Sequence, residues 1–398
     1  NKVFSIGFKT PPYNDTGLQH ILEHSTLCGS RKYPVKDPFV ELCKGSLNTF
    51  LNAMTYPDKT VYPVASCNDV DFKNIMDVYM DAVFYPNIYN KPQIFKQEGW
   101  HYELENEDDE LKINGVVYNE MKGAFSSPDE VLEREIMNHL FPDTTYGCES
   151  GGDPKNIPDL TYENFLNFHR TYYHPSNSYI YLYGNMDMEE KLAFLDEHYL
   201  SHFDYLDVDS VIQEQRAFGA CQDVTLEYPV AENEGEEDNT YLSYNMVVGN
   251  AADSQMAMAF EVLDYALLSA PGAPLKQALL DVKAGKDVYG SYDDGILQPY
   301  FTVIAKGSNP DRKEEFVSVI RQVLGDIVKN GIDKKAVEAG INYFEFRYRE
   351  ADFSSYPKGL MYSLDILGDW LYESKAPFAQ VQMLKVFENL KKAIDEGY

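Results

Sequence analysis

Two histidines and a glutamate near the start of the chain have the types and spacing required for metal-dependent hydrolysis. They are His20, Glu23 and His24 in the segment HILEH. On a helix, the two histidines lie one turn apart on the same face, so both imidazoles can bind one ion. Zinc accepts neutral imidazole and keeps an open position for water in catalytic sites. Glu23 can take a proton from that water, so we expect a zinc-binding helix with Glu23 as general base.

A catalytic zinc ion needs a third protein ligand, and Glu120 is the candidate. It lies in a segment predicted to be helical, with Val116 and Val117 one turn before it. A carboxylate on such an apolar stripe is costly to bury without a cation. The alternative is a carboxylate at the helix edge, or one paired with Lys122 or Arg134. The pattern alone leaves both possibilities open.

The elements that must position these residues are short strands and helices in runs. This order predicts an α+β fold, in which helices pack on one face of a largely antiparallel sheet. We expect the first strand to be followed by the zinc helix, which Thr16 caps. In the first half the remaining expected strands are 48–55, 60–65 and 179–184, and the helices include 38–44, 69–85, 91–104, 116–140, 162–172 and 188–200. In the second half we expect a strand pair, 221–228 and 241–247, before a helix over 252–268.

A chain of 398 residues suits two domains, and the second half repeats the order of the first. The segment HILEH aligns with EVLDY at 261–265, which keeps the apolar positions and lacks both histidines. All eight histidines lie at or before His202. We therefore expect a catalytic domain over 1–202, a linker over 203–220 and a duplicated, inactive domain over 221–375.

Composition narrows the possible partners. The net charge of −30 argues against nucleic acid, because phosphate binding needs basic patches. Such an acidic chain either favours basic ligands, if the charge lines a cavity, or is simply solubilised by its surface. No apolar run is long enough to span a membrane. The five cysteines form no CxxC pair, which favours a reducing compartment, either a bacterial cytoplasm or an organelle lumen.

Other catalytic classes find no support in the sequence. The chain contains no GxxxxGK[ST], GxGxxG or GxSxG motif, so nucleotide binding and serine nucleophile mechanisms are not indicated. It opens on NKVFSIGFKT, without an initiator methionine or a basic and apolar leader. Those residues are typical of the middle of a strand, so we expect that a leader was removed.

Three blocks of sequence resemble a known family. They are HILEHSTLCGSRKYPVKDPF (20–39), KGSLNTFLNAMTYPDKT (44–60) and GVVYNEMKGAF (115–125). They are similar to the presequence protease and falcilysin branch of the pitrilysin/insulinase zinc metallopeptidases. The similarity continues through YGCESGGDP (146–154) and YYHPSNSYIYLYGN (172–185), and more weakly through the second half.

The resemblance implies a role for particular residues. His20, His24 and Glu120 would bind one zinc ion, and Glu23 would be the general base. The segment Asn52, Ala53, Met54 and Thr55 matches the edge strand that family members use to hold substrate. Leu27 and Phe39 match positions that line the pocket beside the scissile bond.

The resemblance also implies an architecture and a substrate class. The chain would hold two tandem α/β roll domains, and residues 376–398 would begin a helical hinge. Two further rolls in a C-terminal half would close a chamber in which short, unstructured peptides are cut. The net charge of −30 adds the expectation that basic peptides are among them. An Arg and a Tyr that steady the substrate carbonyl would come from that half. This chain would then be a fragment, a processed half or one part of a two-part enzyme.

Some features depart from the family or leave alternatives open. Ile113 stands where some relatives carry a further glutamate, so no such helper is expected here. A chain of this length would also suit one subunit of a dimeric processing peptidase. A third alternative is a non-catalytic scaffold, which the intact set of His20, Glu23, His24 and Glu120 argues against.

Overall fold

The computed structural model describes residues 1–231, 235–372 and 377–397. They divide into two units, Asn1–Ala217 with Phe353–Leu367 and Phe218–Asp352 with Gly368–Tyr398. Both units combine helices with an antiparallel sheet, which confirms the α+β class. The chain passes from one unit to the other at 217/218, whereas the expected boundary at 375/376 lies outside the described residues.

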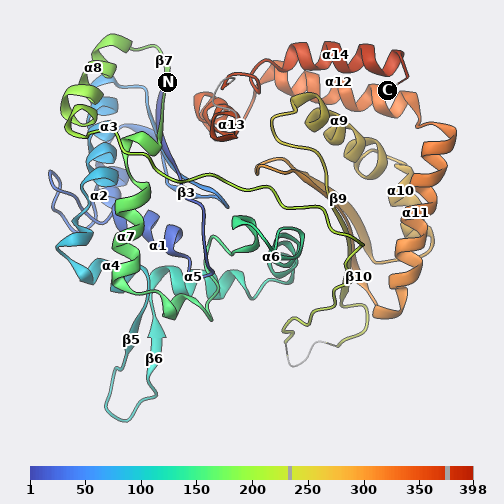
Figure 1. Cartoon of the computed structure of the whole chain (residues 1–398), viewed down its shortest axis with the longest axis horizontal. Coiled ribbons are helices and arrows are strands. Elements are labelled where there is room, and N and C mark those ends of the chain that lie inside the picture. Colours follow the sequence, from blue (N-terminus) through green and yellow to red (C-terminus); the bar gives the residue numbers. More distant parts are fainter. Residues whose placement is uncertain (232–234, 373–376, 398) are drawn as a thin grey trace. The chain divides into compact units, whose positions relative to one another are not determined.

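The main sheet of the first unit is antiparallel and has the order β2-β4-β1-β7, with β3 also paired to β4. Its strands are β1 (Lys2–Lys9), β2 (Asn48–Leu51), β3 (Met54–Thr55), β4 (Lys59–Ser66) and β7 (Ser178–Gly184). A separate hairpin, β5 (His101–Glu103) and β6 (Lys112–Asn114), projects from this unit (Figure 1). The α-helices are α1 (Leu18–Thr26), α2 (Pro38–Gly45), α3 (Asp69–Phe84), α4 (Pro92–Glu98), α5 (Val116–Ala124), α6 (Pro128–Leu140), α7 (Tyr162–Tyr172) and α8 (Met188–His198).

Both faces of strand β1 are buried, and its alternate side chains pack into two different cores. Phe4, Ile6 and Phe8 point into the main core, where α1 and α3 pack. Successive side chains of a strand point to opposite faces, so the odd positions face the other way. There Val3 packs on Leu360 of α13 (Lys358–Tyr372), as part of the segment 353–367. Helix α1 thus follows a strand that is buried except at its two ends.

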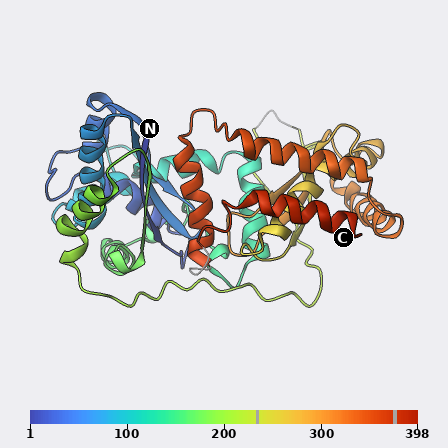
Figure 2. The ribbon, with the colours of Figure 1, turned by 90° about the horizontal axis from the view of Figure 1, so that it is seen from above.

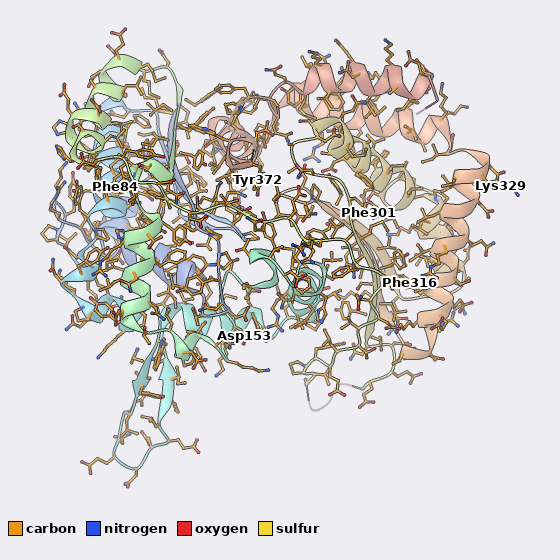
Figure 3. All side chains as sticks on the ribbon, in the orientation of Figure 1. Phe84, Asp153, Phe301, Phe316, Lys329 and Tyr372 are labelled. Carbon is orange, nitrogen blue, oxygen red and sulfur yellow. The ribbon has the colours of Figure 1, made fainter. Side chains whose placement is uncertain are left out.

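The second unit is built on a three-stranded antiparallel sheet of order β8-β10-β9. Phe301 on β10 and Phe316 on α11, both labelled in Figure 3, lie in its core. Helices α12 and α14 lie side by side in the views of Figures 1 and 2 and share a smaller core with α9. The elements are β8 (Thr240–Val247), β9 (Asp287–Asp293), β10 (Tyr300–Ser308), α9 (Ser254–Asp264), a π-helical turn (Tyr265–Ser269), α10 (Pro274–Asp281), α11 (Lys313–Asn330), α12 (Lys334–Glu350) and α14 (Met383–Asp395).

Three expected elements are wrong, each for a local reason. Residues 221–228 form no strand; they are exposed, and β8 pairs with β10 instead. The helix expected over 91–104 ends at Glu98 because Gly99 follows, and the next residues form β5. The helix expected over 116–140 is two helices, because Pro128 cannot donate a backbone hydrogen bond and starts a new one. Among the described residues, no helix is long and apolar enough to cross a membrane.

Candidate metal centre

Helix α1 begins in an unusual way that allows a loop to approach its first turn. Its N-cap is Gly17, in the left-handed conformation with φ 64°, and not Thr16 as expected from the sequence. The Thr16 hydroxyl donates to Asn14 Oδ1 instead. A Cβ on Gly17 would lie 2.6 Å from the carbonyl oxygen of Gly151, so only glycine leaves room for that loop. The Gly151 carbonyl in turn lies 3.0 Å from Nδ1 of His20.

The two histidines of α1 present their rings to one carboxylate. Their ring centroids are 4.9 Å apart. Nε2 of His20 lies 3.7 Å from Oε1 of Glu120, and Nε2 of His24 lies 3.8 Å from Oε2 of the same residue. One ligand atom from each of the three residues falls within 4.8 Å of the others. Among the described residues, no other group of three such side chains is found.

Glu120 reaches the histidines because α5 packs against α4, which packs against α1. A Cβ on Gly115, the N-cap of α5, would lie 2.0 Å from the carbonyl oxygen of Gly99. A Cβ on Gly99 would itself lie 3.1 Å from Ile21 of α1. These close contacts place the start of α5 against the end of α4, and the end of α4 against the helix that carries the histidines.

The expected burial of Glu120 on an apolar stripe is wrong. The Glu120 side chain is 53% exposed, so no cost of burial requires a cation beside it. Val116 is also exposed, and only Val117 is buried on the expected apolar stripe. Arg134, one alternative partner, pairs with Asp153 and Glu135.

Glu23 lies between the two histidines in the sequence. Its side chain is buried and faces strand β3. Its Oε2 accepts a 2.7 Å hydrogen bond from the hydroxyl of Thr55 on β3. The structure therefore brings Thr55, which the family resemblance places in the substrate-binding edge, into direct contact with the expected base. No feature of the sequence pattern indicated this contact.

A second carboxylate, Glu98, lies on the far side of His24. Its Oε2 is 3.4 Å from Nδ1 of His24, while its Oε1 accepts from the Gln97 amide and the Cys28 thiol. Burial alone would lower the pKa of His24, but the hydrogen bond to Glu98 and the negative charges of Glu23 and Glu120 raise it overall. Burial would raise the pKa of Glu98, and the contacts with His24, Gln97 and Cys28 lower it overall.

The sequence analysis missed Glu98, although a signal was present. Ile94 and Phe95, at positions i−4 and i−3, are buried, so Glu98 is the carboxylate that lies on an apolar stripe. It is only 7% exposed. The expectation of a carboxylate buried on an apolar stripe, made for Glu120, therefore holds for Glu98. Glu98 contacts the expected ligand His24 and not the expected ion.

The residues expected to bind substrate lie in several environments. Met54 and Thr55 form β3, whereas Asn52 and Ala53 lie between β2 and β3. The Asn52 backbone N–H donates to Pro63 of β4. Leu27 and Phe39 are partly buried and pack against the main core. Apart from the contact of Thr55 with Glu23, their roles stay predictions.

In the second unit, the repeated helix ends inside the aligned segment 261–265. α9 stops at Asp264, and Tyr265 begins the π-helical turn. Asp264 accepts from the Ser269 hydroxyl, and Tyr265 stacks on Tyr343 with ring centroids 5.2 Å apart. Burial, with Asp294 and Asp264 nearby, raises the pKa of Glu261 to about 7. The aligned side chains thus have packing and hydrogen-bonding partners of their own.

Comparisons with known families match both halves of the chain. Residues 4–148 match the model described as Insulinase (Peptidase family M16), and residues 159–344 match that of the Peptidase M16 inactive domain. The chain belongs to peptidase family M16. The second match covers most of the half that carries no histidine.

Individual relatives agree with this assignment. The chain is 54% identical to the protein HypA of Clostridium perfringens, over 100% of this chain and 41% of that protein. It is 44% identical to presequence protease 1, chloroplastic/mitochondrial, of Arabidopsis thaliana, over 100% of this chain and 37% of that protein. This M16 chain therefore spans about two fifths of the length of these relatives.

Solved structures show the same fold. A putative M16-like peptidase from Alicyclobacillus acidocaldarius superposes with a TM-score of 0.70 at 16% identity, over 98% of this chain and 88% of that one. Pitrilysin gives a TM-score of 0.66 at 16% identity, over 98% of this chain and 41% of that one. The M16 fold is thus shared at identities too low to carry a statement about activity.

Proposed function

We propose that this M16 chain binds one zinc ion through His20, His24 and Glu120. The observation that carries the proposal is the convergence of one ligand atom from each of the three side chains within 4.8 Å, with Nε2 of both histidines within 3.8 Å of a Glu120 carboxylate oxygen. Nδ1 of each ring faces an acceptor, so Nε2 is the nitrogen left to bind an ion. Two imidazoles and one carboxylate, with a position left for water, suit a catalytic zinc ion.

Peptide bond hydrolysis is the chemistry that these side chains support. When bound, zinc supplies a water of lowered pKa and polarises the carbonyl of the scissile bond. Glu23 takes the proton of the attacking water and delivers it to the amine that leaves. The Thr55 hydroxyl holds Oε2 of Glu23, which leaves Oε1 for this proton. The chain is thus proposed to be the catalytic part of a zinc metalloendopeptidase.

We propose short, unstructured peptides as substrates, in line with the names of the presequence protease relatives. Strand β3 pairs with β4, and an extended peptide could add to its other edge through backbone hydrogen bonds. Asn52, Ala53, Met54 and Thr55 would hold the peptide in this way, and Leu27 and Phe39 would line the adjacent pocket. A folded protein presents no free extended segment, so it would be excluded. The net charge of −30 favours basic peptides.

The rest of a longer protein is the proposed partner. The chain spans 41% of its relative from Clostridium perfringens and 37% of that from Arabidopsis thaliana. We propose that the remaining part closes a chamber over the zinc site and supplies the Arg and Tyr that steady the substrate carbonyl. A bacterial cytoplasm or an organelle lumen would suit such an enzyme.

The proposal is tested with a short, basic, internally quenched peptide. We expect slow cleavage by this chain, faster cleavage after addition of the remaining part, and loss of both with a chelator until zinc is restored. Full activity of this chain alone, as a dimer, would favour the processing-peptidase alternative. No cleavage under either condition, with zinc bound, would favour the non-catalytic scaffold.

A further inference from the structure

Glu98 is a buried carboxylate with neutral partners on one oxygen and a histidine on the other. It is 7% exposed on α4, between the Gln97 amide and the Cys28 thiol. A buried carboxylate is costly unless it is hydrogen-bonded or paired with a charge. Among the described residues, the only ion-pair contact found for Glu98 is with His24.

The two ring nitrogens of His24 face different carboxylates. Nδ1 lies 3.4 Å from Oε2 of Glu98, and Nε2 lies 3.8 Å from Oε2 of Glu120. A proton on Nδ1 satisfies Glu98, and the lone pair of Nε2 then points toward the other ligands. The contact thus selects one tautomer and fixes the plane of the ring.

The two metal-facing histidines are supported differently. Nδ1 of His20 faces the neutral carbonyl of Gly151 at 3.0 Å, whereas Nδ1 of His24 faces an acid side chain. An imidazole that donates to a carboxylate is a more basic ligand than one that donates to a carbonyl. The Gln97 and Cys28 contacts hold Oε1 of Glu98, which leaves Oε2 directed at the ring.

We infer that Glu98 is a positioning residue that holds His24 in the orientation and tautomer required to bind the metal ion. This inference rests on the proposed zinc site. Glu98 touches neither water nor substrate in this scheme and acts only through His24. Loss of the Glu98 carboxylate should therefore weaken metal binding more than it changes any other property of the chain.

The test compares zinc affinity, measured by competition with a coloured chelator, between the parent chain and Glu98→Gln. We expect affinity about 10- to 100-fold weaker, the range typical for loss of such a partner. The absorption spectrum of the cobalt form should also shift, because the His24 ligand becomes less basic. Glu105→Gln removes the same charge from the exposed hairpin loop and should bind zinc like the parent.

Two further variants separate the possible failures. His24→Ala should lose most zinc affinity; if it does and Glu98→Gln binds like the parent, the role of Glu98 is overturned and the zinc site stands. If His24→Ala binds zinc like the parent, the site itself is wrong. If circular dichroism shows that metal-free Glu98→Gln does not fold, Glu98→Asp is tested in its place. Its shorter side chain keeps the charge but places it farther from Nδ1 of His24. Parent-like affinity in a folded Glu98→Asp would equally overturn the inference.

Discussion

The hydroxyl of Thr55 donates a 2.7 Å hydrogen bond to Oε2 of Glu23. The two residues come from β3 and α1, which lie more than 30 positions apart in the sequence but pack together in the first unit. A hydrogen bond to a charged acceptor contributes about 1.5–3 kcal/mol, and here it also selects the rotamer of the proposed base.

Replacing Thr55 by valine should therefore slow turnover with little effect on zinc content. We expect kcat to fall by about 10- to 100-fold, from the loss of a hydrogen bond to a charged group. Thr55→Ser keeps the hydroxyl and should stay near the parent rate. Thr49→Val makes the same change at the exposed position of β2 and serves as the matched control. An unchanged kcat in Thr55→Val would show that Glu23 does not depend on this contact.

Zinc stoichiometry checks the three proposed ligands. The parent should hold one zinc per chain, and His20→Ala, His24→Ala and Glu120→Ala should each lower occupancy in elemental analysis. Glu120 is the least buried of the three, so its replacement should disturb folding least. Stoichiometric, tightly held zinc in Glu120→Ala would remove that residue from the site.

Glu23→Gln separates binding from chemistry. The amide has nearly the shape of the carboxylate but cannot take a proton from water, so zinc content should be retained. Turnover of the quenched peptide should fall by roughly 10²- to 10⁴-fold, as is typical for loss of a general base. Cleavage near the parent rate would assign the base to another group.

Ala53→Pro tests the proposed substrate edge. Ala53 lies between β2 and β3, and proline there removes a backbone N–H that an added peptide strand could use. We expect a higher KM, or loss of cleavage, with unchanged zinc content and circular dichroism. Ala217→Pro, at an exposed position outside every helix and strand, serves as the matched control. Parent-like kinetics in Ala53→Pro would exclude this backbone from substrate binding.

His169 should make stability fall as the pH falls from about 6.5 to about 4. Complete burial lowers its pKa to about 4, while the unfolded histidine keeps a pKa of about 6.5. Between these values the unfolded state binds a proton that the folded state does not, so acid favours unfolding, by up to about 3 kcal/mol. Denaturant titrations of the parent and His169→Gln across this range should show a shallower dependence in the variant. An equal dependence of the free energy of unfolding on pH in the two proteins would show that His169 does not cause the effect.

Local sequence was sufficient to predict helix α1 itself. His20, Glu23 and His24 lie within one amphipathic stretch, and helical periodicity alone places the two imidazoles on one face. The same holds for the α+β class, since alternation and helical periodicity depend on neighbours in the chain. Residues 221–228 show the limit: they alternate like a strand, but a strand also needs a neighbouring strand, and β8 pairs with β10 instead.

The surroundings of helix α1 depend on tertiary structure. The Gly151 carbonyl, the Thr55 hydroxyl and the Glu98 carboxylate reach α1 from three distant segments. Sequence periodicity reports which face of an element is apolar, but not which element covers it. The close approach at Gly17 and Gly115 is likewise a property of packed backbones. The sequence thus determined which side chains could bind the ion, while packing decided which groups hold them in position.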